Sequence, residues 1–185
     1  MLHRTYKRVA AIVLTFVTMI GCLPVLPAYA ETISGWSQTF EYNADGTVML
    51  DKEEYRSAPA SLKVTLDSTF TSGGNIHVFQ NLSLVAGRQY KVSMSVKAER
   101  SATFNLLFDW EKSFALNAFS KTFGWTDLSG IFVPSQSKSY KFWIWVKGET
   151  KAVWIDDIQV IDIETGENIV KNGSFSDGVN MSSTG

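Results

Sequence analysis

Hydrophobic and polar residues alternate in short runs along most of this chain after residue 30. In one run, Tyr90, Val92, Met94 and Val96 fall on one side, and the lysines and serines between them fall on the other. A period of two residues is that of a β-strand with one buried face. No segment shows a convincing helical repeat of apolar residues, so the pattern predicts an all-β protein.

The same alternation predicts further strands, separated by glycine, proline and asparagine residues that favour turns. Strands are expected over 47–50, 60–66, 75–84, 103–110, 129–133, 139–147 and 153–163, with an edge segment over 35–40. The stretch 114–125 is expected to be an aromatic-rich connection or edge. The predicted core sets are Leu62, Val64 and Leu66; Phe104, Leu106 and Phe108; and Phe142, Ile144 and Val146. Many short strands of this kind indicate a sandwich or a barrel.

Residues 1–30 have the layout of an export signal. Three basic residues lie within the first eight positions, an apolar run covers 9–20, and Ala28 and Ala30 suit cleavage before Glu31. The alternative is lipoprotein processing at Cys22, but Met19 fits that motif poorly. The apolar run is too short for a membrane span. We therefore expect a secreted or cell-surface bacterial protein, cleaved after Ala30.

The charge and cysteine content narrow the function classes. All 18 acidic residues follow position 30, whereas three of the 17 Lys and Arg residues precede it, so the exported part has a net charge of −4. That balance does not support nucleic-acid binding. The single cysteine, Cys22, lies in the signal, so the exported part has no disulfide, and a bound ion is a candidate stabiliser in its place.

Five motifs occur in a fixed order between residues 33 and 163. They are Gly35-Trp36, Ser57-Ala-Pro-Ala-Ser-Leu-Lys-Val64, Gly87-Arg-Gln-Tyr-Lys-Val-Ser-Met-Ser-Val-Lys97, Trp125-Thr-Asp-Leu-Ser-Gly-Ile-Phe132 and Trp154-Ile-Asp-Asp-Ile158. In this order they resemble the carbohydrate-binding modules of families 4, 9, 16 and 22. The resemblance implies a two-sheet antiparallel β-sandwich of the galactose-binding-like jelly-roll type. It also implies a non-catalytic domain that binds a polysaccharide such as β-glucan or xylan and tethers a secreted enzyme or surface protein to it.

The chain departs from that family at its ends. The modules usually begin with an Asn-Gly-Xaa-Phe-Glu strand, which is missing before Gly35, while Asn172-Gly-Ser-Phe175 occurs near the C-terminus. We therefore expect the binding domain over 31–165. Residues 166–185 are interpreted as either the start of a second module or a closing strand with a tail. The parent protein is expected to carry linked catalytic or further binding modules.

The candidate ligand site centres on Trp143 and Trp145. Both face away from the predicted core set of their strand, so they form a row about 7 Å long on which a sugar chain can lie. A flat ring complements the C–H face of a pyranose, and we expect at least one of the two to be exposed. Asn105 and Asp109 lie on the corresponding face of their strand, and Trp110 lies at its rim. The alternative is ordinary packing under a loop, which is the role expected for Trp36, Trp125 and Trp154.

The candidate metal ligands are Asp157, Asp156 and Glu41. Successive strand residues alternate in direction, so at most one of the two aspartates points inward, where a carboxylate must be paired or bind an ion. In the resembled family the acid of the last strand helps hold a structural calcium, which oxygen ligands suit. Asp157 is favoured over Asp156, and Glu41 is a substitute for a missing family glutamate. A hydrogen-bonded aspartate without metal is the alternative.

Two other function classes stay open. His77 is the only histidine after the signal, which argues against a zinc site or a histidine-dependent triad. A jelly-roll glycan hydrolase or lyase would need only two carboxylates. Asp109 and Glu111 are the candidates for that role, but we interpret them as surface charges. A structural spacer of a cell-surface protein is the third possibility.

Overall fold

The strands predicted from the alternation pair into two facing sheets. The structure, a computed structural model, describes residues 29–30, 32–42, 44–66, 75–99, 102–119, 123–147 and 150–178. The six-stranded sheet has the order β1 (Tyr29–Ala30), β3 (Gly46–Asp51), β4 (Ser61–Leu66), β11 (Thr150–Asp162), β6 (Tyr90–Ala98) and β9 (Phe123–Phe132). The five-stranded sheet has the order β2 (Ser37–Glu41), β5 (Asn75–Leu84), β10 (Lys138–Lys147), β7 (Ala102–Phe108) and β8 (Lys112–Phe119).

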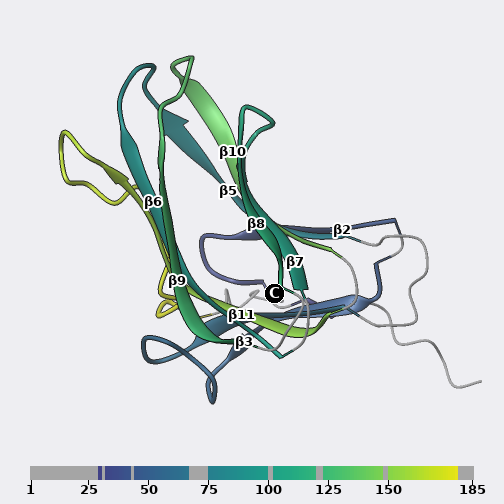
Figure 1. The fold of residues 1–185 in the computed structure, drawn as a ribbon. Helices are drawn as coiled ribbons and strands as arrows, with labels where there is room; N and C mark the ends of the chain where they lie inside the picture. Colours follow the sequence, from purple (N-terminus) through teal and green to yellow (C-terminus); the bar gives the residue numbers. More distant parts are fainter. Residues whose placement is uncertain are drawn as a thin grey trace, which may run out of the picture.

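The architecture is a two-sheet antiparallel β-sandwich, as predicted. All strand pairs are antiparallel except β1 with β3, where Tyr29 and Ala30 run parallel to Thr47 and Val48. Figure 1 shows β5, β7, β8 and β10 on one side of the fold and β3, β6, β9 and β11 on the other. None of the described residues belongs to a helix that could cross a membrane.

The core lies between the sheets and consists of the residues that the alternation assigns to it. The side chains with at most 5 % exposure include Leu62, Val64 and Leu66 of β4; Tyr90, Val92, Met94 and Val96 of β6; Leu106 and Phe108 of β7; and Phe142, Ile144 and Val146 of β10. The side chain of Phe104 lies outside the described set. Burying such an apolar side chain contributes roughly 1.5–3 kcal/mol, so these alternating sets fix which face of each strand turns inward.

The stretch 114–125 was expected to be a connection or an edge, and its described part confirms the edge. It is not a connection, because it holds most of β8 and the start of β9, and β9 extends well before the predicted strand at 129–133. β8 is an edge strand that pairs only with β7. An edge strand has a neighbouring strand on one side only, so its apolar and polar residues need not alternate strictly. Alternation is therefore a weak guide to the position of such a strand.

The last strand, β11, contains an irregularity that the alternation of apolar and polar residues does not predict. The pairing of β11 with β6 shifts register between Asp156 and Gln159, and Asp157 has a left-handed φ of 50°. As a result Ile155 and Ile158 both have at most 1 % exposure although they are three residues apart. This is a β-bulge, which adds a residue to one strand and changes the facing of those that follow.

Residues 166–178 follow β11 and pack onto the same core. Phe175 is fully buried, and its ring centroid lies 5.9 Å from that of Trp36. The Trp36 indole N–H donates to the carbonyl oxygen of Asn172 (3.1 Å), and the backbone N–H of Ile158 donates to that of Gly173 (2.9 Å). The backbone N–H of Ser34 donates to the carbonyl of Gly178 (3.1 Å). The described part of this segment is therefore built into the sandwich.

Candidate functional site

The five predicted ligand residues gather on the outer side of the five-stranded sheet. Strand β10 lies between β5 and β7, and its inward residues alternate with Trp143 and Trp145. The register places Asn105 of β7 directly opposite Trp145. Asp109 and Trp110 occupy the turn between β7 and β8, next to the same strand. We call this surface, with the residues of β5 described below, the tryptophan face.

The indoles form a perpendicular arrangement. Trp143 and Trp145 are nearly parallel, with ring centroids 6.4 Å apart and 10° between their planes. The Trp110 ring stands edge-on to both, at 5.0 Å from Trp143 and 6.3 Å from Trp145. Trp110 is 74 % exposed, whereas Trp143 is 6 % exposed and Trp145 is half-buried. The expectation that Trp143 or Trp145 would be exposed is therefore wrong, and the ring open to solvent is that of Trp110.

Asp109 fixes the turn that brings Trp110 over the sheet. It adopts a left-handed φ of 46°, which Asp tolerates better than most residues. Its backbone N–H donates to the Lys141 carbonyl (2.9 Å), its carboxylate accepts from the Lys141 N–H (3.0 Å), and its carbonyl accepts from the Trp143 indole (3.2 Å). The carboxylate also pairs with Lys138 (2.9 Å). These contacts make Asp109 a positioning residue for Trp110 and Trp143.

Two residues of β5 complete the tryptophan face. His77 lies opposite Trp145 and Phe79 lies opposite Trp143. The His77 ring is edge-on to Trp143 at 4.5 Å and to Trp145 at 6.0 Å. Sequence reasoning missed both residues in this role. The alternation within 75–84 could have predicted that both side chains point outward. Their contact with the tryptophans depends on the pairing of β5 with β10, which alternation does not predict.

His77 is a neutral, buried member of this cluster. It is 3 % exposed, and within the described residues neither ring nitrogen has a hydrogen-bond partner. Burial lowers the pKa of His77, an effect that Glu41 partly offsets, with an oxygen 3.4 Å from Nδ1. An imidazole that stays neutral acts here as an aromatic ring, packed against two indoles.

The carboxylates considered for hydrolysis are tied to structural partners. Glu111 accepts from the Tyr140 hydroxyl (2.7 Å) and from the Ser135 N–H (2.6 Å). The hydrogen bond from Tyr140 is the largest cause that lowers the pKa of Glu111, so this carboxyl is ionised and unsuited to protonating a leaving group. Asp109 is held by Lys138 and Lys141. Glu111 is therefore a poor candidate for a general acid.

Asp156 and Asp157 lie at the bulge of β11, away from the tryptophan face. Asp156 is fully buried and accepts from the backbone N–H groups of Arg56, Ser57 and Asp157 at 2.8–2.9 Å. Burial raises the pKa of Asp156 although these donors oppose it. Asp157 accepts from the Ser57 hydroxyl (2.8 Å). Backbone amides thus occupy both oxygens of Asp156, as in the metal-free alternative.

Glu41 lies in the other sheet, on β2, next to His77. The described residues contain no cluster of three or more His, Cys, Asp or Glu side chains suited to a metal ion. The three predicted ligands therefore do not fit one site. Calcium binding by Asp157 or Asp156 stays a prediction, which a melting curve with chelator and with added calcium would test.

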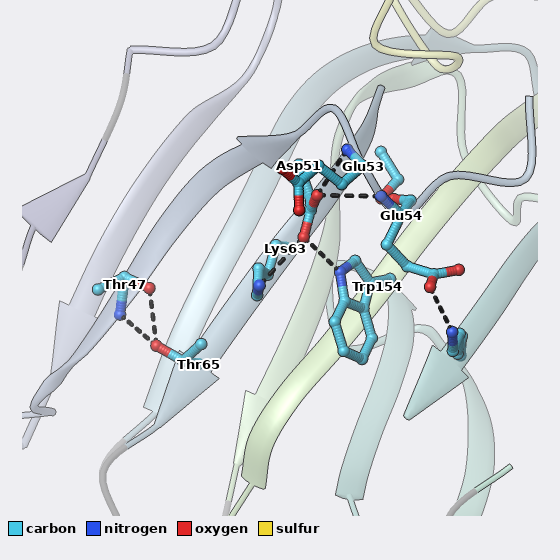
Figure 2. Close-up of polar contacts among 9 residues, drawn as sticks. Thr47, Asp51, Glu53, Glu54, Lys63, Thr65 and Trp154 are labelled. Carbon is cyan, nitrogen blue, oxygen red and sulfur yellow. Dashed lines mark hydrogen bonds and ion pairs between the residues drawn. The ribbon is translucent and has the colours of Figure 1, made fainter. Parts of the chain in front are cut away.

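The six-stranded sheet carries tryptophans of a different kind on its outer side. The Trp154 indole donates to the Asp51 carboxylate (2.9 Å), which also accepts from Lys63 Nζ and from the backbone N–H groups of Glu53 and Glu54. Figure 2 shows these donors converging on Asp51. Burial alone would raise the pKa of Asp51, but the donors together hold it well below its usual range. Trp154 is 9 % exposed, in agreement with its predicted packing role.

Solved structures with a similar fold include carbohydrate-binding modules. One is TmCBM61 in complex with β-1,4-galactotriose, with a TM-score of 0.53 and 15 % identity over 71 % of this chain and 91 % of that chain. Another contains the CBM22-1-GH10 modules of a Clostridium thermocellum endo-1,4-β-D-xylanase complexed with xylohexaose. Its TM-score is 0.51, with 19 % identity over 72 % of this chain and 27 % of that longer chain.

Comparisons by sequence add nothing to this. No family model matches the chain, and no curated protein matches it. The structural likeness, at these low identities, concerns the arrangement of the strands. This chain therefore shares the β-sandwich fold of carbohydrate-binding modules.

Proposed function

We propose that this protein is a non-catalytic polysaccharide-binding domain whose ligand lies on the tryptophan face. The observation that carries the proposal is the exposure of the Trp110 ring, 74 %, beside Trp143 and Trp145 on the outer side of a sheet. A large aromatic ring left in water at a cluster of further rings is a typical binding surface. Its apolar face suits the C–H groups of a sugar ring.

The surrounding polar groups supply directional contacts. Asn105 is half-buried opposite Trp145, where its amide can bond sugar hydroxyls. Trp145 lies between Asn105 and His77 across the sheet, so a glycan that crosses the strands from β7 would meet the Asn105 amide and then the Trp145 ring. A glycan such as β-glucan or xylan is the ligand class we propose.

Binding without catalysis would serve a tethering role. A domain that holds a polysaccharide raises the effective concentration of any module joined to it. We propose this role in a secreted or cell-surface protein of a bacterium, consistent with the export signal expected from residues 1–30. Glu111 and Asp109, the carboxylates considered for hydrolysis, are engaged by Tyr140 and Lys138, which favours binding over hydrolysis.

The test is a titration of the purified protein with soluble β-glucans, xylans and galactans, followed by tryptophan fluorescence and calorimetry. Trp110→Ala should weaken binding about 5- to 150-fold, the range for an aromatic anchor worth roughly 1–3 kcal/mol. Tyr55→Ala is the matched control, because Tyr55 is an exposed aromatic (40 %) outside the tryptophan face.

Three outcomes would contradict the proposal. Equal loss of affinity in the Tyr55 and Trp110 variants would place the ligand elsewhere. Release of reducing ends or unsaturated products would establish an enzyme. A failure to bind any glycan in the panel would favour the structural spacer.

A further inference from the structure

A lysine ammonium lies between two rings of the tryptophan face. Lys141 Nζ is 4.1 Å from the ring centroid of Phe79 and 4.7 Å from that of Trp143. The electron-rich faces of both rings attract the cation and limit its movement. The ammonium also covers part of the Trp143 ring, so a ligand that reaches this end of the face meets a positive charge.

The charge of Lys141 is not compensated by a nearby acid. Among the described residues, no carboxylate oxygen lies within ion-pairing distance of its Nζ. The nearby Lys138 differs, because it pairs with Asp109 at 2.9 Å. Glu41 of β2 faces His77 and not Lys141.

A small hollow adjoins Lys141 on the side of β2 and β5. It encloses about 230 Å³, and its lining includes Ser37, Phe79, Asn81 and Lys171. Phe79 is thus shared between the hollow and the Lys141 ammonium. Lys171 is exposed, and within the described residues it has no ion pair either.

The lining of this hollow contains a lysine and no acid, unlike the linings of two other polar hollows. No Asp or Glu lines it. The hollow over β6 and β9 includes Asp127 and Asp157, and the hollow beside the C-terminal segment includes Asp157 and Asp177. In a domain whose expected net charge is negative, Lys171 in the lining and Lys141 against the lining residue Phe79 favour an anion there.

We propose that the hollow, with Lys171 in its lining and Lys141 against its Phe79, is a subsite for the carboxylate of a uronic acid in an acidic polysaccharide. Phe79 offers a ring for the sugar, and Ser37 and Asn81 offer hydroxyl and amide groups for its hydroxyls. Each lysine donates a charge-assisted hydrogen bond, which is stronger than a neutral one. This inference rests on the proposed function, since the subsite continues the tryptophan face.

The experiment compares acidic polymers with their own carboxyl-reduced forms. Polygalacturonate, alginate and glucuronoxylan are titrated against the protein, each beside the polymer in which its uronates are reduced to neutral sugars. At least one acidic polymer should bind about five- to tenfold more tightly than its reduced form, from two partly exposed charge contacts. The preference should shrink at high salt, because salt screens exposed charges.

Two variants assign the preference to the subsite. Lys141→Gln and Lys171→Gln should each reduce the ratio of the affinity for the acidic polymer to the affinity for its reduced form. Lys52→Gln is the control, because it removes the same charge at an exposed position beyond the face. Trp110→Ala should weaken both forms alike.

The outcomes separate the two proposals. Equal binding of every acidic polymer and its reduced form, with loss in Trp110→Ala, would overturn the uronate subsite and leave the tryptophan face intact. A preference that persists in both lysine variants would also overturn the subsite. Absence of binding to all polymers, acidic and neutral, would overturn both proposals.

Discussion

Both outer faces of the sandwich carry tryptophans, but the contacts of these tryptophans differ between the two faces. On the six-stranded sheet the indole N–H groups of Trp154 and Trp125 donate to the carboxylates of Asp51 and Glu54, each at 2.9 Å (Figure 2 shows the first). Lys63 and Lys97 lie over the Trp154 ring, with Nζ at 5.1 and 5.3 Å from its centroid. On the five-stranded sheet the rings of Trp110, Trp143 and Trp145 contact one another, and the Trp143 indole N–H donates to a backbone carbonyl.

This difference shows what separates a structural tryptophan from a binding one. A ring whose N–H has a carboxylate partner and whose faces carry ammonium groups has its interactions satisfied within the fold. A ring that projects from a turn over other rings, as Trp110 does, leaves apolar area in water. The residue type is the same on both faces, so the neighbours decide the role.

The largest expected effect is the loss of stability when Trp154 is removed. Trp154→Ala should lower the free energy of unfolding by about 3–5 kcal/mol, the usual cost of truncating a buried Trp. The matched variant Trp110→Ala should cost about 1 kcal/mol or less, because the ring is mostly exposed. Denaturant unfolding of both variants measures the contrast. Similar losses in the two variants would remove the distinction between the faces.

The next effect concerns the charge of Asp51. Asp51→Asn should cost about 2 kcal/mol at pH 7, because the carboxylate gathers charge-assisted hydrogen bonds in a site that is 13 % exposed. The pKa of Asp51 is lower in the folded protein than in the unfolded chain, so its contribution is present above about pH 4 and is lost as the pH falls below that. Unfolding curves from pH 7 to pH 3 test this. A constant gap between the two proteins over that range would contradict the assigned pKa direction.

The smallest effect concerns His77 on the tryptophan face. Burial lowers the pKa of His77, so below about pH 6.5 the unfolded chain takes up a proton that the folded protein does not. Stability should therefore decline from pH 7.5 to pH 5.5 by less than about 1 kcal/mol for each pH unit. His77→Phe should abolish this slope while keeping a ring between Trp143 and Trp145. A slope that survives the substitution would assign the titration to another group.

Much of the fold follows from the sequence because alternation is a local signal. The inward sets of β4, β6 and β10 could be predicted from period two alone, and so could the outward direction of Trp143 and Trp145. His77 and Phe79 pair with Trp145 and Trp143 across 68 and 64 positions of the chain, so their place was not predictable from a local signal.

Two backbone features explain the remaining differences. The left-handed conformation of Asp109 turns Trp110 back over Trp143, which buries the indole that alternation alone would leave exposed. The bulge at Asp157 ends strict alternation in β11, so Ile155 and Ile158 are both buried although they lie three residues apart. Each feature is a left-handed φ at a single residue, and the pattern of apolar and polar residues does not predict it.

The closing segment has a consequence for how the chain folds. The Trp36 indole reaches Asn172 across 136 positions of the chain, and the Asn172 amide reaches Ser34 across 138. Contacts so distant in sequence form only after nearly the whole chain has been gathered, and proteins dominated by such contacts fold in milliseconds to seconds rather than microseconds. Because Trp36 is buried against Phe175, its fluorescence would time the moment at which the two ends of the domain meet.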